Sequence, residues 1–99
     1  MGIAMNVAKK VVHDKIESQI KIAQAKLETL KAKAEAGKAN AELKAITDLL
    51  TRKRAIEQEL DQLKQTGEAK WEQAKTNVES RMSELEQSVR ALEGKLITA

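Results

Sequence analysis

The hydrophobic positions near the C-terminus of the chain follow a seven-residue repeat. Two series, each spaced by seven, are offset so that the steps between them alternate three and four: Trp71, Val78, Leu85 and Leu92, and then Met82, Val89 and Leu96. That spacing places a narrow apolar stripe on one side of an α-helix. Lys75 interrupts the stripe, and we expect Ala74 to help fill the gap. The pattern predicts a helix over about residues 68–95 that packs against another helix.

Two further apolar stripes precede this one. Near the N-terminus the apolar residues again alternate steps of four and three: Ile16, Ile20, Ala23, Leu27, Leu30 and Ala34. In the middle of the chain the steps follow three, four and four: Ala41, Ala45, Leu49, Ile56, Leu60 and Leu63. Arg52 occupies the empty position of this eleven-residue repeat, which keeps a stripe on one side of a nearly straight helix. Both segments are therefore predicted to be helical.

Gly67 marks the clearest boundary, because it stands between two strongly helical patterns. A glycine just past the end of a helix readily takes the left-handed conformation that closes the last turn. Glu68 then falls in the first turn of the next helix, where a carboxylate complements the helix dipole. These residues predict a turn over about residues 65–68.

Gly37 and Asn40 leave two arrangements open. One is a second turn, with Asn40 as the N-cap of the helix that follows. Against a turn, the flanking residues are rich in alanine, and a single glycine inside a helix costs only ~1 kcal/mol. We therefore predict an all-α fold in which one long helix, about residues 4–65, forms an antiparallel hairpin or coiled coil with the helix over 68–95. The alternative is a three-helix bundle.

The two arrangements differ in the apolar surface that they leave exposed. At 1.5 Å per residue, a helix of some sixty residues is ~90 Å long, and the second helix covers less than half of it. An uncovered apolar stripe predicts a homo-oligomer or a protein partner, whereas a three-helix bundle would bury all three stripes within one chain. In either case residues 1–99 form one domain. The expected packing or interface residues are Ile16, Ile20, Leu27, Leu30, Leu49, Ile56, Leu60, Leu63, Trp71, Val78, Met82, Leu85, Val89 and Leu92.

The composition narrows the class of protein. The 99 residues include no Cys, Pro, Phe or Tyr and a single Trp. The absence of cysteine excludes disulfides, and no apolar run is long enough to span a bilayer, so we expect a cytoplasmic protein. Lys and Arg number 18 against 15 Asp and Glu, for a net charge of +3, with the two signs mixed along most of the chain. Nucleic-acid-binding proteins instead gather basic residues on one face, so we expect no nucleic-acid partner.

Groups that could carry chemistry are few. His13 is the only histidine, and a metal site would need the carboxylates of Asp14 and Glu17 beside it, so a surface histidine is the preferred interpretation. The four glycines stand too far apart to form a phosphate-binding loop. We therefore expect no enzyme activity, no cofactor and no metal site. Trp71 lies on the apolar stripe, where we expect it to anchor helix packing.

Parts of the chain resemble a known family. The stretch KIAQAKLETLKAKAEAGKANAELKAITDL, the later ELDQLK and the phrase WEQAKTNVES are similar to small stand-alone bacterial coiled-coil proteins. Those proteins carry Lys/Ala/Glu repeats, a glycine and then a phrase such as WEDLKAGVESAWDEL. This chain lacks the second Trp of that phrase, and Met82 stands near its place. Such proteins are often labelled apolipoprotein-like, and some cyanobacterial relatives are described as stress-response proteins. The resemblance implies a bacterial, stress-related protein without catalytic residues.

Two functional hypotheses follow. The first is a non-enzymatic coiled-coil protein that acts by self-association or by scaffolding a partner through its helical stripes. The alternative is an amphipathic helical protein that binds anionic lipid surfaces reversibly through its basic start, where Lys9, Lys10 and Lys15 lie near Val11 and Val12. The stripes are narrow and rich in alanine, which favours the first hypothesis over a membrane surface.

Overall fold

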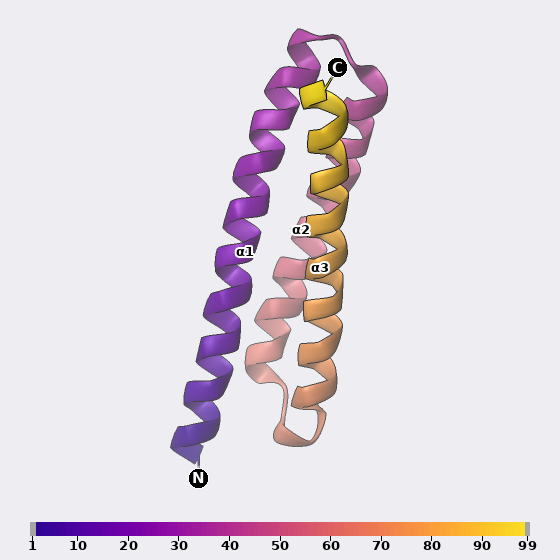
Figure 1. The fold of residues 1–99 in the computed structure, drawn as a ribbon. Coiled ribbons are helices and arrows are strands. Elements are labelled where there is room, and N and C mark those ends of the chain that lie inside the picture. Colours follow the sequence, from indigo (N-terminus) through magenta and orange to yellow (C-terminus); the bar gives the residue numbers. More distant parts are fainter. Residues whose placement is uncertain (1, 99) are drawn as a thin grey trace.

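Three helices make up the described part of the chain. The computed structural model describes the backbone of residues 2–98 and the side chains of residues 9–96. Helix α1 spans Gly2–Ala36, α2 spans Asn40–Gln65 and α3 spans Glu68–Thr98. The helices lie side by side in an up-down-up arrangement, with the N-terminus beside the α2–α3 turn and the C-terminus beside the α1–α2 turn (Figure 1). The predicted all-α class is confirmed, and the molecule is a slender bundle of 54 × 16 × 15 Å.

The prediction of a long helix over residues 4–65 paired with a shorter one is wrong, because the chain turns at residues 37–39. The physical reason is burial. When α2 folds back along α1, the three apolar stripes face one another, whereas one continuous helix would leave much of α1 without a partner. Burying apolar surface stabilises the fold by ~25 cal/mol per Å². Summed along the length of a helix, this gain exceeds the cost of the few helical hydrogen bonds that are lost at the turn. The turn predicted over about residues 65–68 is confirmed, since α2 ends at Gln65 and α3 begins at Glu68.

The core is a single column in which the three stripes meet. Its members are Ile16, Ile20, Ala23, Leu27, Leu30 and Ala34 from α1, Ile46, Leu49, Ile56, Leu60 and Leu63 from α2, and Trp71, Val78, Met82, Leu85, Val89 and Leu92 from α3. All the residues expected to pack are in this column. Within the described residues, no helix combines the length and apolar character needed to cross a membrane.

The stripe of α2 differs from the predicted eleven-residue repeat. Its buried positions are Ile46, Leu49, Lys53, Ile56, Leu60 and Leu63, whose steps alternate three and four as in the other two helices. Ala41 is exposed and Ala45 is only half-buried, so the repeat was assigned one residue out of phase in the first half of this helix. Two alanines spaced by four imitate stripe positions there and hide the buried position of Ile46.

Lys53, rather than Arg52, fills the polar position of the α2 stripe. Arg52 is exposed, whereas Lys53 is only 8% exposed. The ammonium group of Lys53 donates to Oε1 of Gln24 on α1 at 2.8 Å and pairs with Oε1 of Glu57 at 2.8 Å. The side chain therefore lies along the core with its charged end at the rim, and it links α1 to α2.

Polar contacts at the rim link α3 to each of the other helices. Lys26 on α1 lies 3.7 Å from Glu93 on α3, and Arg81 on α3 pairs with Glu59 on α2. Exposed pairs of this kind contribute ~0–1 kcal/mol each. The apolar column therefore supplies most of the stability, and the rim contacts favour one register of the helices.

The core assignment predicts a large difference between two neighbouring positions on α3. Leu85 is 1% exposed, whereas Ser83 is exposed. Leu85→Ala should lower the free energy of unfolding by ~2–5 kcal/mol, because it leaves a cavity among packed side chains. Ser83→Ala should change it by less than ~0.5 kcal/mol. Urea denaturation followed by circular dichroism measures both values, and similar losses would mean that the helical phase is wrong.

The position of Lys53 generates a second prediction. Lys53→Met removes the ammonium group and leaves the buried Oε1 of Glu57 and the Oε1 of Gln24 without their partner. Removing one member of a buried polar pair is destabilising, so the free energy of unfolding should fall by ~1–3 kcal/mol. Arg52→Met, at an exposed position, is the control. Equal free energies of unfolding in the two variants would mean that the polar link contributes nothing to stability.

Candidate functional site

The turn between α1 and α2 is the most unusual stretch of backbone in the described chain. The amide of Ala39 donates to the carbonyl of Ala34 at 2.8 Å, and the amide of Lys38 donates to the carbonyl of Glu35 at 3.2 Å. This pair of bonds is a Schellman motif, in which one residue after the helix must take the left-handed conformation. That residue is Lys38, with a φ of 54°, and it is the one non-glycine residue with positive φ in the described chain.

Gly37 and Asn40 are the two residues expected to shape this turn, and each lies one position away from the left-handed or capping position that the turn contains. Gly37 immediately precedes the left-handed position and does not itself have positive φ. In the alternative with a turn here, Asn40 is the N-cap of α2, but the structure makes it the first helical residue, and the cap is Ala39, which makes no side-chain hydrogen bond. A left-handed residue other than glycine costs ~1–2 kcal/mol, and an alanine cap forfeits ~1 kcal/mol. The turn is therefore weakly encoded in the sequence.

The turn between α2 and α3 is closed differently. Gly67 was expected to be left-handed, but the described chain has no glycine with positive φ. Thr66 is extended instead, and its hydroxyl donates to the carbonyl of Gln62 at 2.9 Å. The ammonium group of Lys9 on α1 donates to the carbonyl of Thr66 at 3.4 Å, so this turn is also tied to the first helix.

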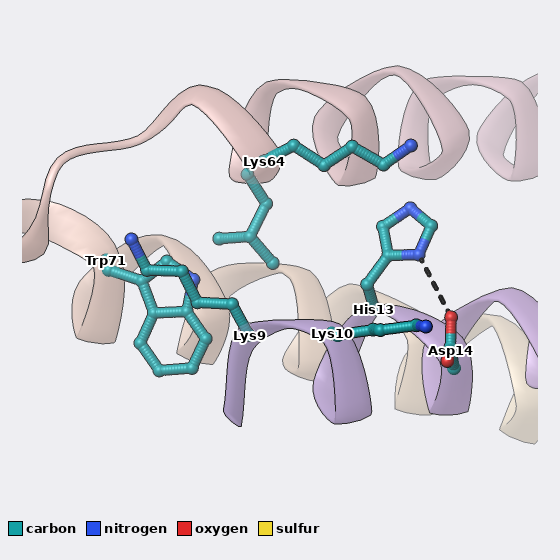
Figure 2. Close-up of a pocket in the computed structure, with 7 residues that line it drawn as sticks. Lys9, Lys10, His13, Asp14, Lys64 and Trp71 are labelled. Carbon is teal, nitrogen blue, oxygen red and sulfur yellow. Dashed lines mark ion pairs between the residues drawn. The ribbon is translucent and has the colours of Figure 1, made fainter. Parts of the chain in front are cut away.

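A groove of about 390 Å³ opens beside the α2–α3 turn. Helix α1 contributes Lys9, Lys10 and His13 to its walls, and α2 contributes Lys64 (Figure 2). Leu63 and Trp71 supply its apolar surface. The three lysines face a single lining carboxylate, that of Asp14, so the groove carries an excess of positive charge.

Trp71 is nearly enclosed at this end of the core, with 4% of its surface exposed. The ammonium groups of Lys9 and Lys75 lie 6.0 and 5.5 Å from the centre of its ring, within the range of cation–π attraction. Its indole Nε1 is buried and donates to no acceptor in the described part of the chain. The predicted packing role of Trp71 accounts for the ring, but it leaves this donor unused.

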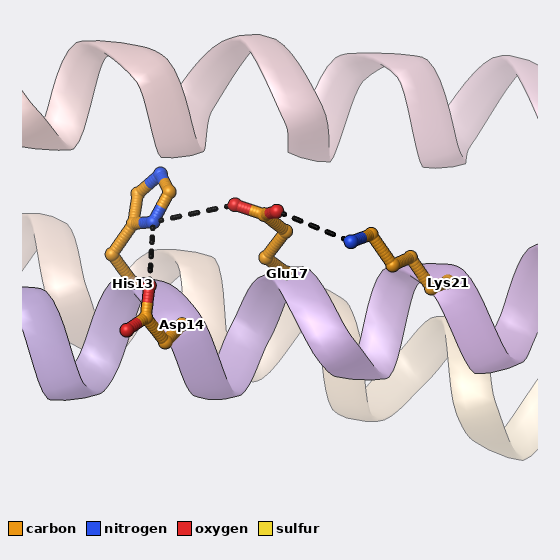
Figure 3. Close-up of polar contacts among 4 residues, drawn as sticks. All are labelled: His13, Asp14, Glu17 and Lys21. Atoms are coloured by element: carbon orange, nitrogen blue, oxygen red, sulfur yellow. Dashed lines mark ion pairs between the residues drawn. The ribbon is translucent and has the colours of Figure 1, made fainter.

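His13 was expected on the surface, but its side chain is only 15% exposed and lies against the groove. Its Nδ1 lies 3.6 Å from Oδ1 of Asp14 and 3.5 Å from Oε2 of Glu17, and the other oxygen of Glu17 lies 3.5 Å from the ammonium group of Lys21 (Figure 3). These contacts are longer than good hydrogen bonds.

Among the described residues, His13, Asp14 and Glu17 form the cluster that could hold a metal ion. Their ligand atoms lie within 4.8 Å of one another. Two ligand atoms of a tetrahedral zinc ion lie ~3.4 Å apart. The distances from Nδ1 of His13 to the carboxylate oxygens of Asp14 and Glu17 are close to this value. Asp14 and Glu17 are well exposed, however, and Lys10 and Lys64 line the groove next to His13, which opposes the binding of a cation. The arrangement is better suited to holding the imidazole in place.

The sequence could not reveal the groove, since its walls come from three helices whose residues are far apart in the chain. Comparison with known proteins identifies no relative, because no family model, curated protein or solved structure matches the chain. The resemblance to bacterial coiled-coil proteins therefore stays a prediction, and the site must be interpreted from its own geometry.

The weak turn generates a third prediction. Lys38→Gly should raise the free energy of unfolding of the monomer by ~1 kcal/mol, because glycine takes positive φ without a steric penalty. Lys44→Gly is the matched control, since Lys44 is an exposed residue inside α2, and there glycine should lower stability by ~1 kcal/mol. Thermal and urea denaturation measure both, and a loss in each variant would contradict a left-handed Lys38.

Proposed function

We propose that this chain is a non-enzymatic structural protein that self-associates by exchanging α1 between two copies, with the turn at residues 37–39 as the hinge. The observation that carries the proposal is the left-handed, non-glycine Lys38 in a turn without a side-chain cap. Short hinge loops under strain favour domain exchange, which is a low-cost route to a dimer.

Exchange is favoured over face-to-face association by the position of the apolar stripes. The residues expected to form an interface are buried within one chain, and the large apolar residues exposed among the described side chains are Val11 and Ile22. Self-association through the stripes therefore requires α1 to leave its own bundle. In an exchanged dimer, α1 of each copy packs on α2 and α3 of the other, so every core contact is formed again and no new interface chemistry is needed.

In the exchanged form the hinge becomes helical. Helices α1 and α2 then join into one helix, and this is the arrangement that the alanine-rich flanks and the absence of proline predicted for residues 4–65. Lys38 leaves the left-handed region, and each chain gains hydrogen bonds across the former turn. The closed monomer is favoured because two separate chains keep the translational and rotational entropy that is lost when a dimer forms. The balance between the two forms therefore depends on protein concentration.

Substitutions at position 38 test the hinge in both directions. Lys38→Gly favours the turn by ~1 kcal/mol and disfavours the continuous helix by ~1 kcal/mol, so two hinges should weaken the dimer by ~4 kcal/mol, or roughly 10³-fold. Lys38→Ile should strengthen the dimer, because a β-branched residue is strongly disfavoured at positive φ. Sedimentation equilibrium gives the mass of each variant, and small-angle scattering distinguishes the longer dimer.

Lys44→Gly is again the control, since residue 44 is helical in both forms and the substitution should leave the monomer–dimer balance unchanged. A dimer whose stability does not respond to either substitution at position 38 would mean association through another surface. A monomer that persists in all variants up to millimolar concentration would overturn the proposal. The melting temperature of the wild type should rise with concentration in the range where dimer forms.

Reversible binding to anionic lipid surfaces is the alternative function. One observation favours it, because Val11 is 61% exposed and lies between Lys10 and Lys15 in the sequence. The main stripe of α1 is turned into the core, however, and an interfacial helix needs a wide apolar face. Exchange is therefore the better-supported proposal. The family resemblance implies a stress-related role in bacteria for it, and the composition predicts a cytoplasmic setting.

A further inference from the structure

We infer that the groove lined by Lys10, Lys64, Leu63 and Trp71 binds a small organic anion, with a carboxylate or similar head on a short apolar body. The groove lies at the α2–α3 end of the bundle, opposite the hinge (Figures 1 and 2). The inference does not depend on exchange of α1, because the groove is complete within one chain.

The charge of the groove determines the sign of the ligand. Lys9, Lys10 and Lys64 line it against one carboxylate, that of Asp14, which lies 3.6 Å from His13. Lys9 is already held by the carbonyl of Thr66 and by the ring of Trp71. Among the ion pairs between described side chains, neither Lys10 nor Lys64 takes part, so these two ammonium groups are available to an anionic head.

The apolar surface determines the rest of the ligand. Leu63 and Trp71 line the groove although each is almost fully buried, so they lie below the level of the lysines. The buried indole N–H of Trp71 meets no acceptor in the described chain. A volume of about 390 Å³ is at the lower end of the range for small-molecule sites.

The position of Leu63 and Trp71 beneath the lysines distinguishes the binding of a free anion from binding to a membrane surface. A flat, anionic bilayer reaches exposed lysines on any side of the protein, but it does not reach Leu63 and Trp71 beneath them. A small molecule does both. A response of Trp71 that requires a charged head and an apolar body together therefore distinguishes the two sources of anion.

Hexanoate is a suitable probe, and Trp71 is a suitable reporter because it is the one Trp in a chain without Tyr. The indole N–H of a ¹⁵N-labelled sample gives a single cross-peak, whose shift on titration reports binding at the groove. We expect saturable binding of hexanoate to the full chain, with a dissociation constant on the order of 1 mM. Acetate, which has the charge alone, and hexanamide, which has the body without the charge, should each bind at least about tenfold more weakly.

Variants of the two available lysines provide the second arm. Lys10→Gln with Lys64→Gln should weaken hexanoate binding by about tenfold or more. Lys31→Gln with Lys44→Gln is the matched control, since it removes the same charge at exposed positions near the hinge end and should leave binding unchanged. Circular dichroism checks that both double variants keep their helix content. The comparison of hexanoate with hexanamide on the wild type does not depend on either variant.

Three outcomes would overturn the inference. Equal shifts with acetate would mean that charge alone is recognised, and equal shifts with hexanamide would mean that the lysines are not used. A response to phosphatidylglycerol vesicles but not to hexanoate, with phosphatidylcholine vesicles inactive, would assign the basic end to a membrane surface. Because the mass of the protein is measured separately, none of these results bears on the exchange of α1.

Discussion

The mutual burial of three narrow apolar stripes is the constraint on which the rest of this structure depends. Each stripe is only one or two residues wide, so no pair of helices encloses it, and burial requires all three helices to meet along their length. Small residues such as Ala23 and Ala34 lie in the column beside larger ones, which lets α1 approach its neighbours closely. Trp71 is the aromatic residue of this core. If one helix moved away, the core would therefore have few large side chains to fill the space that it left.

The α1–α2 turn shows this tertiary constraint prevailing over local preference. The sequence around residue 37 is rich in alanine and has no proline, and it favours a helix. Within a single chain, folding back is nevertheless required to cover α1, so the monomer accepts a left-handed Lys38 and an uncapped start of α2. A turn with glycine at position 38 and a polar cap at position 39 would remove the conflict. This conflict between local and global preference is the reason for proposing the turn as a hinge.

Periodicity predicted the elements of the fold better than their connections. The heptad steps identified the buried faces of α1 and α3, because apolar residues recur there with a single interruption, at Lys75. In α2 the phase was misassigned at its start, where Ala41 and Ala45 mimic a stripe and the buried Lys53 hides one. The turn at residues 37–39 was the alternative and not the preferred prediction, because the alanine-rich flanks and the apparent eleven-residue repeat both favour a continuous helix. The groove was inaccessible to sequence reasoning, since Lys10, Lys64 and Trp71 become neighbours only after the helices pack.

The hinge and the groove interact in a way that follows from their geometry. In an exchanged dimer, Lys10 of one copy would meet Lys64 and Trp71 of the other, so each dimer would hold two complete grooves. A ligand that binds two states with equal affinity shifts no equilibrium between them, however tightly it binds. It does oppose the open intermediate, in which α1 has left the bundle and the groove is divided. An organic anion in the groove would therefore slow the exchange of α1 in both directions while leaving the proportion of monomer and dimer unchanged.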